Sequence, residues 1–336
     1  MHMQQDISLK PYTTFGIEAK TRWFTEVSSV KTLQTVLQAH RDTPKLILGG
    51  GSNLLLTQDF PGLVIRVAIP GIDIVAEDAE YTFVKAGAGV VWQKLVEASL
   101  EMGLSGLENL SLIPGSVGAS PMQNIGAYGV EIKDVFHALE ALHIETGEIH
   151  SFNAADCRFG YRESVFKHAY KGQYVIVSVT YKLSKKPHYQ ISYGDIQKTL
   201  EEMGVTELSS RAISQAVIQI RRSKLPDPAE LGNAGSFFKN PEIPVAQYET
   251  LKAQYPNLPG YLTTPGQIKV PAGWLIEQAG WKGYREGEAG VHTRQALVLV
   301  NYGQATGEAI KNLAEKIQVS VLEKYGIALS AEVNFI

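Results

Sequence analysis

Cysteine, long apolar runs and an excess of charge of either sign are all missing from this chain. Cys157 is the single cysteine in 336 residues, which excludes an intramolecular disulfide and any multi-cysteine metal site. No apolar run approaches membrane-spanning length, and no basic amino-terminal region precedes one. The formal charge of −3 gives no reason to expect binding to nucleic acid or to a membrane. We therefore expect a cytoplasmic protein.

The signatures of several common sites are absent as well. The eight histidines are scattered without the H-x-x-x-H or H-E-x-x-H spacing of a metal site, so no metal is expected. Neither G-x-G-x-x-G nor a Walker lysine occurs, which argues against a Rossmann dinucleotide site and a P-loop. The segment around Ser236 does not match the G-x-S-x-G nucleophile elbow, so the sequence gives little support to a hydrolase.

The length of the chain indicates two or three domains. We place boundaries at Pro70-Gly71 and at Leu225–Pro228, where turn residues interrupt the regular patterns. The first two segments mix helices and strands. Capping residues and apolar periodicity predict helices over 30–37, over 92–103 and from Ser209 or Ser210 to the prolines, and strands over 45–48, 63–67, 81–85, 135–144, 148–152 and 174–183.

The third segment is rich in proline and is expected to be mostly loop as far as Pro271. A short helix near 274–279 and a strand over 296–301 follow. A long helix over 306–325 is predicted because Ile310, Leu313, Ile317 and Val321 form one apolar stripe. The alternation of apolar and polar residues over 327–336 predicts a final strand.

Two glycine clusters are the most informative segments of the chain. Leu112–Gly129 holds four glycines and two prolines, has no charged residue, and shows neither the helical nor the strand period of apolar residues. Leu48–Leu54 holds three consecutive glycines directly after a strand-like run. Glycine lets the main chain approach an anion closely, and free N–H groups can form a concave nest for phosphate oxygens. Two nests suit a ligand with a diphosphate, although either cluster alone could be an ordinary tight loop.

Three polar side chains lie in settings that allow a chemical role. Arg162, beside glycine and aromatic residues, could fork onto a carboxylate or phosphate, or could pair with Glu163 or Asp156 at the surface. Ser236 could be a positioned hydroxyl or a turn residue. Glu332 faces away from the apolar side of the last strand, where it could be solvated or held protonated as a donor.

These segments together make the chain resemble the UDP-N-acetylenolpyruvoylglucosamine reductases, also called UDP-N-acetylmuramate dehydrogenases. The resemblance is collinear and covers nearly the whole chain. Its motifs are Thr13–Gly16, Leu48–Leu54, Ile113–Gly118, Gln123–Gly129, Tyr161–Ser164, Lys224–Pro228, Gly232–Pro241, Ala272–Glu277 and Ala331–Val333. The segment Ser192–Asp195 and the region around Tyr261 are similar to the longer subclass of this family, which has an extra tyrosine-bearing loop.

The resemblance implies an α+β chain with a vanillyl-alcohol-oxidase/PCMH-type FAD-binding fold. Two α/β subdomains would bind FAD, and a third α+β domain would bind the substrate. The first subdomain would comprise 1–69 with the closing strand 327–336, the second 70–225, and the substrate-binding domain 226–326. Because neither glycine cluster contains histidine or cysteine, we expect the FAD to be non-covalent.

The resemblance also assigns residue roles. Arg162 and Glu332 correspond to a pair that stabilises negative charge on the substrate carboxylate, and Ser236 to a general acid. FAD would be held by Gly49, Gly50, Gly51, Ser52, Asn53, Leu54, Ile113, Pro114, Gly115, Ser116, Gly118, Asn124, Gly126, Ala127 and Tyr128. The UDP-sugar would be held by Tyr193, Lys224, Asn240, Tyr261 and Gln295.

The implied reaction is the NADPH-dependent, FAD-mediated reduction of enolpyruvyl-UDP-N-acetylglucosamine to UDP-N-acetylmuramate, a step of peptidoglycan precursor synthesis. NADPH and the UDP-sugar would be its small-molecule partners, and we expect a monomer. Two alternatives remain open at this point. One is a flavin oxidase of the same superfamily acting on an alcohol or hydroxy acid, and the other is a non-catalytic regulator that binds a flavin or a sugar nucleotide.

Overall fold

The computed structural model describes residues 2–336, which fall into two compact units. Unit 1 comprises the residues up to Ile7, then Thr21–Gly50 and Pro61–Ser223. Unit 2 comprises Ser8–Lys20, Gly51–Phe60 and Lys224–Ile336. The chain therefore passes between the units several times. The three-domain division, with its boundary at residues 69–70, stays a prediction.

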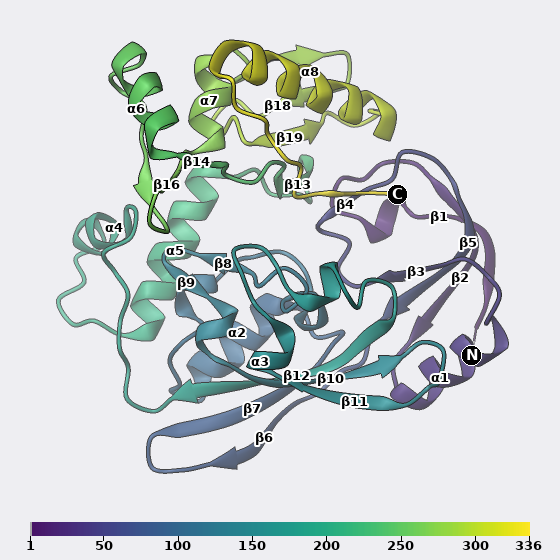
Figure 1. Ribbon diagram of the computed structural model, residues 1–336. Helices are drawn as coiled ribbons and strands as arrows, with labels where there is room; N and C mark the ends of the chain where they lie inside the picture. Colours follow the sequence, from purple (N-terminus) through teal and green to yellow (C-terminus); the bar gives the residue numbers. More distant parts are fainter. Residues whose placement is uncertain (1) are drawn as a thin grey trace. The chain divides into compact units, whose positions relative to one another are not determined.

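The first sheet of unit 1 carries the first glycine cluster at the end of one strand. Its strand order is β1 (Gln4–Ser8), β2 (Lys20–Val27), β5 (Phe60–Val67), β3 (Lys45–Leu48). Helix α1 (Val30–Ala39) begins at Ser29, whose hydroxyl accepts the Thr32 N–H at 3.1 Å. The helix buries its apolar stripe in a cluster that also holds Leu63, Ile65 and Val67 of β5. Figure 1 labels α1 and the strands of this sheet, drawn in shades of purple. The predicted helix and both predicted strands of this region are present.

The second sheet of unit 1 is antiparallel, in the order β11 (Ile149–Asn153), β10 (Phe136–His143), β12 (Tyr174–Ser184), β7 (Tyr81–Gly87), β6 (Ile72–Glu77). Helix α2 (Trp92–Glu101) packs on it, with the Trp92 and Tyr181 rings edge to face at 5.8 Å. The Tyr181 hydroxyl lies 2.7 Å from the Ser120 hydroxyl. Burial raises the pKa of Tyr181, so this phenol stays protonated and ties the glycine-rich loop to the sheet.

Two helices at the end of unit 1 form a separate apolar cluster. Helix α5 (Ser210–Lys224) was predicted from its stripe, whereas α4 (Ile196–Glu202) was not. α4 is short and follows an irregular segment, so it offers too few periods to be recognised. Tyr128 of the glycine-rich loop packs against this cluster.

Unit 2 is built around helix α8 (Gly307–Tyr325), which begins at Thr306 and ends at Gly326 in the left-handed conformation. It covers a sheet of β13 (Gly232–Ser236), β19 (Val298–Asn301), β18 (Ala289–Val291) and β17 (Arg285–Glu286). The buried Asn301 donates through its Nδ2 to the carbonyls of Phe15 and Gly16 at 3.0 and 3.3 Å. This side chain fastens an early segment of the chain to the sheet.

The sequence prediction was wrong for part of unit 2. The region expected to be loop contains α6 (Val245–Gln254) and a sheet of β14 (Glu242–Pro244), β16 (Gln267–Lys269) and β15 (Tyr261–Leu262). α6 buries Leu251 alone and so lacks an apolar stripe. The final strand is also shorter than predicted. β20 covers Asn334–Phe335 and pairs in parallel with β4 (Leu54–Leu55), while residues 327–333 belong to no strand and make one isolated bridge, between Ala331 and Phe238.

No helix among residues 2–336 is long and apolar enough to cross a membrane.

The lone cysteine leads to a prediction about solvent access. Cys157 is buried at the end of α3 (Ala154–Cys157), and burial, with a smaller contribution from Asp156, raises the pKa of its thiol to about 12. At pH 8 the reactive thiolate should be roughly 10³-fold scarcer than in an exposed cysteine. We expect a disulfide reagent such as DTNB to label the native protein at least ~10²-fold more slowly than the urea-unfolded chain. Equal rates in both states would contradict the burial of this side chain.

Candidate functional site

The two glycine clusters meet within unit 1. A Cβ atom added to Gly50 would lie 2.8 Å from the Gly115 Cα, and one added to Gly49 would lie 2.5 Å from the Ser116 hydroxyl oxygen. Gly50 has no room for a side chain, because the atoms that its Cβ would meet are main chain, whereas at Gly49 the Ser116 hydroxyl would have to move. The sequence analysis attributed these glycines to the approach of an anion, and the close backbone contact is a further reason for glycine at position 50. The close contact brings the two predicted nests together.

The second cluster is held by main-chain hydrogen bonds to the turn between β7 and α2. Val117 N–H donates to Val90 O, and Gly118 N–H donates to Ala88 O, both at 2.9 Å. A Cβ at Gly118 would lie 2.6 Å from that of Ala88. These two amides therefore have protein partners and are not available to a phosphate.

One buried hydroxyl of the same loop lacks a hydrogen-bond partner within residues 2–336. Ser116 Oγ is buried and makes no hydrogen bond among the described residues. Buried hydroxyls normally have a partner. Nearby, Leu112, Asn124 and Tyr128 adopt left-handed backbone conformations with φ of 59°, 44° and 51°, which are costly for residues other than glycine. An unpaired buried hydroxyl beside a tight glycine contact fits a bound polar group such as the FAD diphosphate.

The remaining cofactor-loop residues form a small hairpin. β8 (Gly126–Ala127) pairs with β9 (Val130–Glu131), and Tyr128-Gly129 makes the turn with positive φ at both residues. Such a turn normally takes asparagine or glycine first, so a tyrosine in that place is a strained choice.

The side chain of Asn124 makes hydrogen bonds within the protein. It is fully buried, and its Nδ2 donates to Gly160 O at 3.0 Å and to the Glu131 carboxylate at 3.1 Å. Its Oδ1 accepts the Lys133 N–H at 3.1 Å. Because its amide is occupied in this way, the side chain shapes the loop and holds the neighbouring Gly160 segment.

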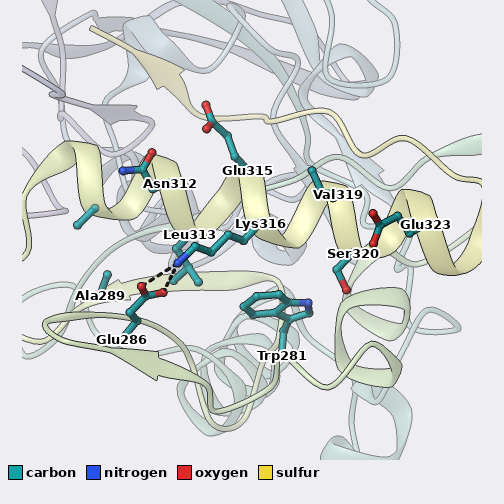
Figure 2. A pocket seen from close by; sticks show the side chains of 11 residues that line it. Trp281, Glu286, Ala289, Asn312, Leu313, Glu315, Lys316, Val319, Ser320 and Glu323 are labelled. Carbon is teal, nitrogen blue, oxygen red and sulfur yellow. Dashed lines mark hydrogen bonds and ion pairs between the residues drawn. The ribbon is translucent and has the colours of Figure 1, made fainter.

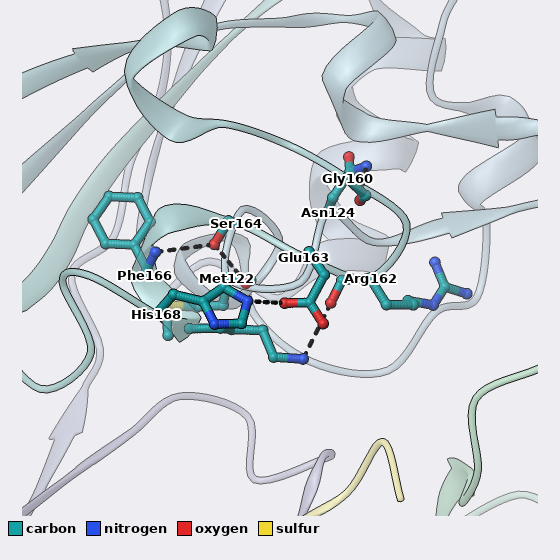
Figure 3. A network of polar contacts seen from close by, with 9 residues as sticks. Met122, Asn124, Gly160, Arg162, Glu163, Ser164, Phe166 and His168 are labelled. Carbon is teal, nitrogen blue, oxygen red and sulfur yellow. Dashed lines mark hydrogen bonds and ion pairs between the residues drawn. The ribbon is translucent and has the colours of Figure 1, made fainter. Parts of the chain in front are cut away.

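Arg162 lies in a tight turn beside this loop. The main chains of Gly160 and Glu163 bond each other, which leaves Arg162 at a corner with φ of 56°. Its Nη2 donates to Gly126 O at 2.8 Å. Figure 3 shows its side chain extending away from Glu163, whose carboxylate lies 2.6 Å from His168 Nε2. The turn therefore aims a strained arginine at the cofactor loop, where functional residues tend to carry such strain.

A second arginine, which the sequence analysis missed, belongs to the same cluster. Arg221 on α5 donates through Nε to Leu112 O at 3.2 Å and hydrogen-bonds the Tyr128 side chain. Burial lowers the pKa of Arg221, Tyr128 opposes this shift, and the positive charge of Arg162 adds to it. Arg221 lies one helical turn after the buried Val217. This spacing places it on the inward face of α5, and it was the signal in the sequence that could have identified it. Two neighbouring guanidiniums around one loop favour an anionic ligand.

Tyr193 lies against the hairpin turn of this loop. A Cβ added to Gly129 would come within 3.3 Å of the Tyr193 Cβ. The tyrosine is 57% exposed, which leaves its ring accessible to a ligand. Unit 1 thus contains the predicted site residues Gly49, Gly50, Ile113, Pro114, Gly115, Ser116, Gly118, Asn124, Gly126, Ala127, Tyr128, Arg162 and Tyr193.

In unit 2 the structure brings Ser236 and Glu332 onto neighbouring segments. Glu332 N–H donates to Phe237 O at 2.8 Å, so the glutamate lies beside the residue that follows the serine. Ser236 is exposed, follows Gly235 with φ of 68°, and is flanked by the buried Phe237. Asn53 donates to Glu332 O at 3.3 Å. The same unit therefore links the second part of the first glycine cluster, Gly51 to Leu54, to Glu332.

Two predicted substrate residues meet at the start of α7 (Ala272–Gln278). Asn240 Oδ1 accepts the Ala272 N–H at 2.9 Å. Gln295 Oε1 would lie 3.1 Å from a Cβ added to Gly273. Both side chains therefore have structural contacts in addition to any role toward a ligand. The other two predicted substrate residues of unit 2 lie on different elements. Tyr261 is exposed in β15, and Lys224 is exposed at the end of α5.

Unit 2 also holds a groove of about 720 Å³ that contains none of the predicted site residues. It runs along α8 beside Trp281, and the Lys316–Glu286 ion pair of 2.7 Å crosses it (Figure 2). Because it has no glycine loop or arginine, this groove does not match the site predicted from the sequence.

Two family models match the chain. The model described as "UDP-N-acetylenolpyruvoylglucosamine reductase, C-terminal domain" matches residues 227–336. The model described as "FAD binding domain" matches residues 22–153. The second range includes both glycine clusters.

Curated relatives match over the full length. The UDP-N-acetylenolpyruvoylglucosamine reductase of Pseudomonas syringae pv. tomato is 52% identical over 336 residues, with 99% of each chain covered. That of Flavobacterium johnsoniae is 51% identical over 337 residues, with both chains fully covered.

Solved structures agree. The UDP-N-acetylenolpyruvylglucosamine reductase of Thermus caldophilus superimposes with a TM-score of 0.69 at 27% identity, over 99% of each chain. The p-cresol methylhydroxylase structure, at a TM-score of 0.50 and 12% identity over 96% of this chain and 83% of that one, supports the PCMH-type fold alone. The fold prediction is thus confirmed, and the chain belongs to the UDP-N-acetylenolpyruvoylglucosamine reductase family.

Proposed function

We propose that this chain reduces enolpyruvyl-UDP-N-acetylglucosamine to UDP-N-acetylmuramate, with FAD as cofactor and NADPH as co-substrate, in the synthesis of peptidoglycan precursors. The observation that carries this proposal is the full-length identity of about half the residues to proteins named for this reaction. The matched FAD-binding model over residues 22–153 supports the cofactor.

FAD supplies a hydride acceptor and donor when it is bound. The chain itself has to hold the diphosphate, bind the substrate carboxylate and deliver a proton. The contact between Gly50 and Gly115, with the unpaired hydroxyl of Ser116 beside it, is our candidate for the diphosphate site.

Arg162 is our candidate for binding the substrate carboxylate. Its left-handed turn and the hydrogen bond from Nη2 to Gly126 O fix the direction of the side chain. A guanidinium carries five N–H donors in a planar fork, the geometry that matches a carboxylate. A fixed positive group stabilises charge that develops during the reaction more strongly than a mobile one does.

Ser236 and Glu332 are our candidates for the proton donor and a second carboxylate-binding group. The serine hydroxyl is exposed, and its backbone is fixed by the adjacent bond from Phe237 N–H to Leu297 O at 2.8 Å. Glu332 is half-buried and is fastened through its own main chain. Tyr193, Lys224, Asn240, Tyr261 and Gln295 are proposed to bind the UDP-sugar.

The proposal is tested by anaerobic reduction of the purified protein with NADPH, followed by addition of the enolpyruvyl substrate. We expect the visible absorbance of the oxidised flavin to bleach and then to recover. Recovery with oxygen but not with the enolpyruvyl sugar would indicate an oxidase. A protein that NADPH does not bleach would indicate a non-catalytic binder.

Enlarging Gly50 should weaken FAD binding. The Cβ of a Gly50→Val variant would push residues 49–50 away from Gly115, so the loops would lose their mutual alignment. We expect at least a ~10-fold loss of flavin affinity, since displaced hydrogen bonds to a charged group contribute on the order of 1.5–3 kcal/mol. Folding is checked by the protection of Cys157 from DTNB. Stoichiometric FAD in a folded Gly50→Val protein would contradict this site.

Ser236→Ala should slow the second half-reaction while it leaves reduction by NADPH nearly intact. A positioned proton donor typically contributes about 10²–10⁴-fold, and hydride transfer from NADPH does not need it. Stopped-flow reoxidation of the reduced flavin by substrate measures the effect. Ser330→Ala, an exposed serine on the segment that pairs with residues 237–239, is the matched control and should behave as wild type. If both half-reactions fell equally, Ser236 would be structural.

Arg162→Lys should be poorly tolerated although it preserves the charge. An ammonium cannot bond Gly126 O and fork onto a carboxylate at the same time, so we expect substrate-driven reoxidation to fall roughly 10²-fold. Arg158→Lys is the control, because Arg158 is an exposed arginine with the same left-handed backbone, φ of 48°. Equal activity of the two variants would show that Arg162 does not contact the reacting substrate.

A further inference from the structure

The segment that carries Tyr193 has no regular structure of its own. Residues 187–195 form neither helix nor strand, although α4 follows at once. Tyr189 and Ile191 pack against the apolar cluster of α4 and α5, while Tyr193 points outward and is 57% exposed. The main chain of this segment therefore needs polar partners from elsewhere in the unit if the tyrosine is to be held in place.

The hairpin turn of the glycine-rich loop packs directly on this segment. A Cβ added to Gly129 would lie only 3.3 Å from the Tyr193 Cβ. In the other direction, a Cβ on Gly194 would lie 3.8 Å from Tyr128 Cδ1. The two turns therefore pack against each other, and the contact at Gly129 leaves little room for a side chain.

A single buried side chain joins the two segments by hydrogen bonds. Asn109, 2% exposed, donates through Nδ2 to Tyr128 O at 3.0 Å and to Gln190 O at 2.8 Å. Both partners are carbonyl oxygens, which accept only, so the amide nitrogen must face them and both of its hydrogens are used. One carbonyl belongs to the cofactor loop and the other to the tyrosine segment.

The turn that carries Asn109 is itself fixed on both sides. The buried Glu108 carboxylate accepts the Gly106 N–H at 2.6 Å, and Ser111 Oγ donates to Glu108 O at 2.7 Å. Trp92 Nε1 donates to Leu110 O at 2.8 Å. A rigid base of this kind lets one side chain set the positions of two irregular segments.

We propose that Asn109 is a positioning residue that locks the tyrosine segment onto the cofactor loop and thereby sets affinity for the UDP-sugar. This inference rests on the proposed function, because it takes Tyr193 as a contact of that substrate. With the lock intact, Tyr193 is presented to the substrate in one arrangement. Without it, substrate binding has to order residues 187–195, and that cost falls on binding rather than on the chemical step.

The test uses Asn109→Asp in the FAD-containing enzyme. The substitution keeps the shape but replaces the donor by an acceptor that faces two carbonyl oxygens. We expect amide hydrogen exchange in residues 187–195 to accelerate about 10-fold or more without substrate, since two hydrogen bonds are lost. KM for the enolpyruvyl substrate should rise by a similar ~10-fold, while kcat and the rate of reduction by NADPH stay within about 2-fold.

Asn301→Asp is the matched control. Asn301 is also buried and also donates to two carbonyl oxygens, those of Phe15 and Gly16, but its bonds lie within unit 2. It should lower the midpoint of urea unfolding without a selective change of exchange in residues 187–195. If both variants raised exchange there equally, the effect would come from general loss of stability, and the proposal would be overturned.

A double-mutant cycle with Tyr193→Ala isolates the coupling. If Asn109 acts through the tyrosine, Asn109→Asp should add little, less than about 2-fold, to the KM already raised by Tyr193→Ala. Full multiplication of the two effects would overturn the proposal, as would unchanged exchange and KM in Asn109→Asp. Asn109→Ala repeats the measurements if the aspartate variant does not fold.

The exchange experiment separates this inference from the proposed function. If the wild-type enzyme did not reduce the enolpyruvyl sugar, the proposed function would fail. The accelerated exchange of residues 187–195 in Asn109→Asp would still establish the lock, and unchanged exchange would reject it.

Discussion

The need to satisfy the main-chain polar groups of an irregular, glycine-rich segment governs the architecture of unit 1. Leu112–Gly129 forms no long helix or strand. Short turns within the segment bond part of its main chain, and the turn after β7, Asn109 and Arg221 bond further N–H and carbonyl groups. Each of these partners lies on a regular element or a fixed turn. The loop thus acquires one conformation without regular structure, as a site for a charged ligand requires.

The same constraint explains why so many residues near the loop adopt unfavourable backbone angles. Leu112, Asn124, Tyr128 and Arg162 all have positive φ, at a cost of about 1 kcal/mol or more each. The surrounding hydrogen bonds and the packing of Tyr128 on the α4–α5 cluster hold them there. Among the described residues, Asp6 in β1 and Arg158 after α3 also have positive φ. The other four non-glycine residues of this kind lie around the residues that the family resemblance assigns to cofactor and substrate.

Regular elements could be predicted where their physical cause is periodic. α8 shows an apolar stripe, a threonine cap and a final glycine, and it forms within a residue of the predicted ends. α6 could not be predicted in this way because it buries only Leu251. Family resemblance pointed to Arg162, Ser236 and Glu332, whose catalytic roles stay predictions. Arg221 and Asn109 were missed because their importance depends on what lies opposite them in space, which no spacing along the chain reveals. The glycines at 49 and 50 were selected for the approach of an anion, which stays a prediction, and the structure adds a second reason: the closeness of a neighbouring loop.

The pairing of β20 with β4 has a consequence for how the protein is made. Leu54–Leu55 are synthesised early, yet their strand partner is Asn334–Phe335, some 280 residues later, and Asn53 also bonds the main chain of that late segment. Contacts of such separation close slowly because a long loop must first be ordered. All residues of unit 1 have been synthesised once the ribosome has translated Ser223. At that point Leu55 of unit 2 still lacks its strand partner, which has not yet been translated. Nascent unit 2 is therefore the part with the longer exposure to chaperones and proteases during synthesis.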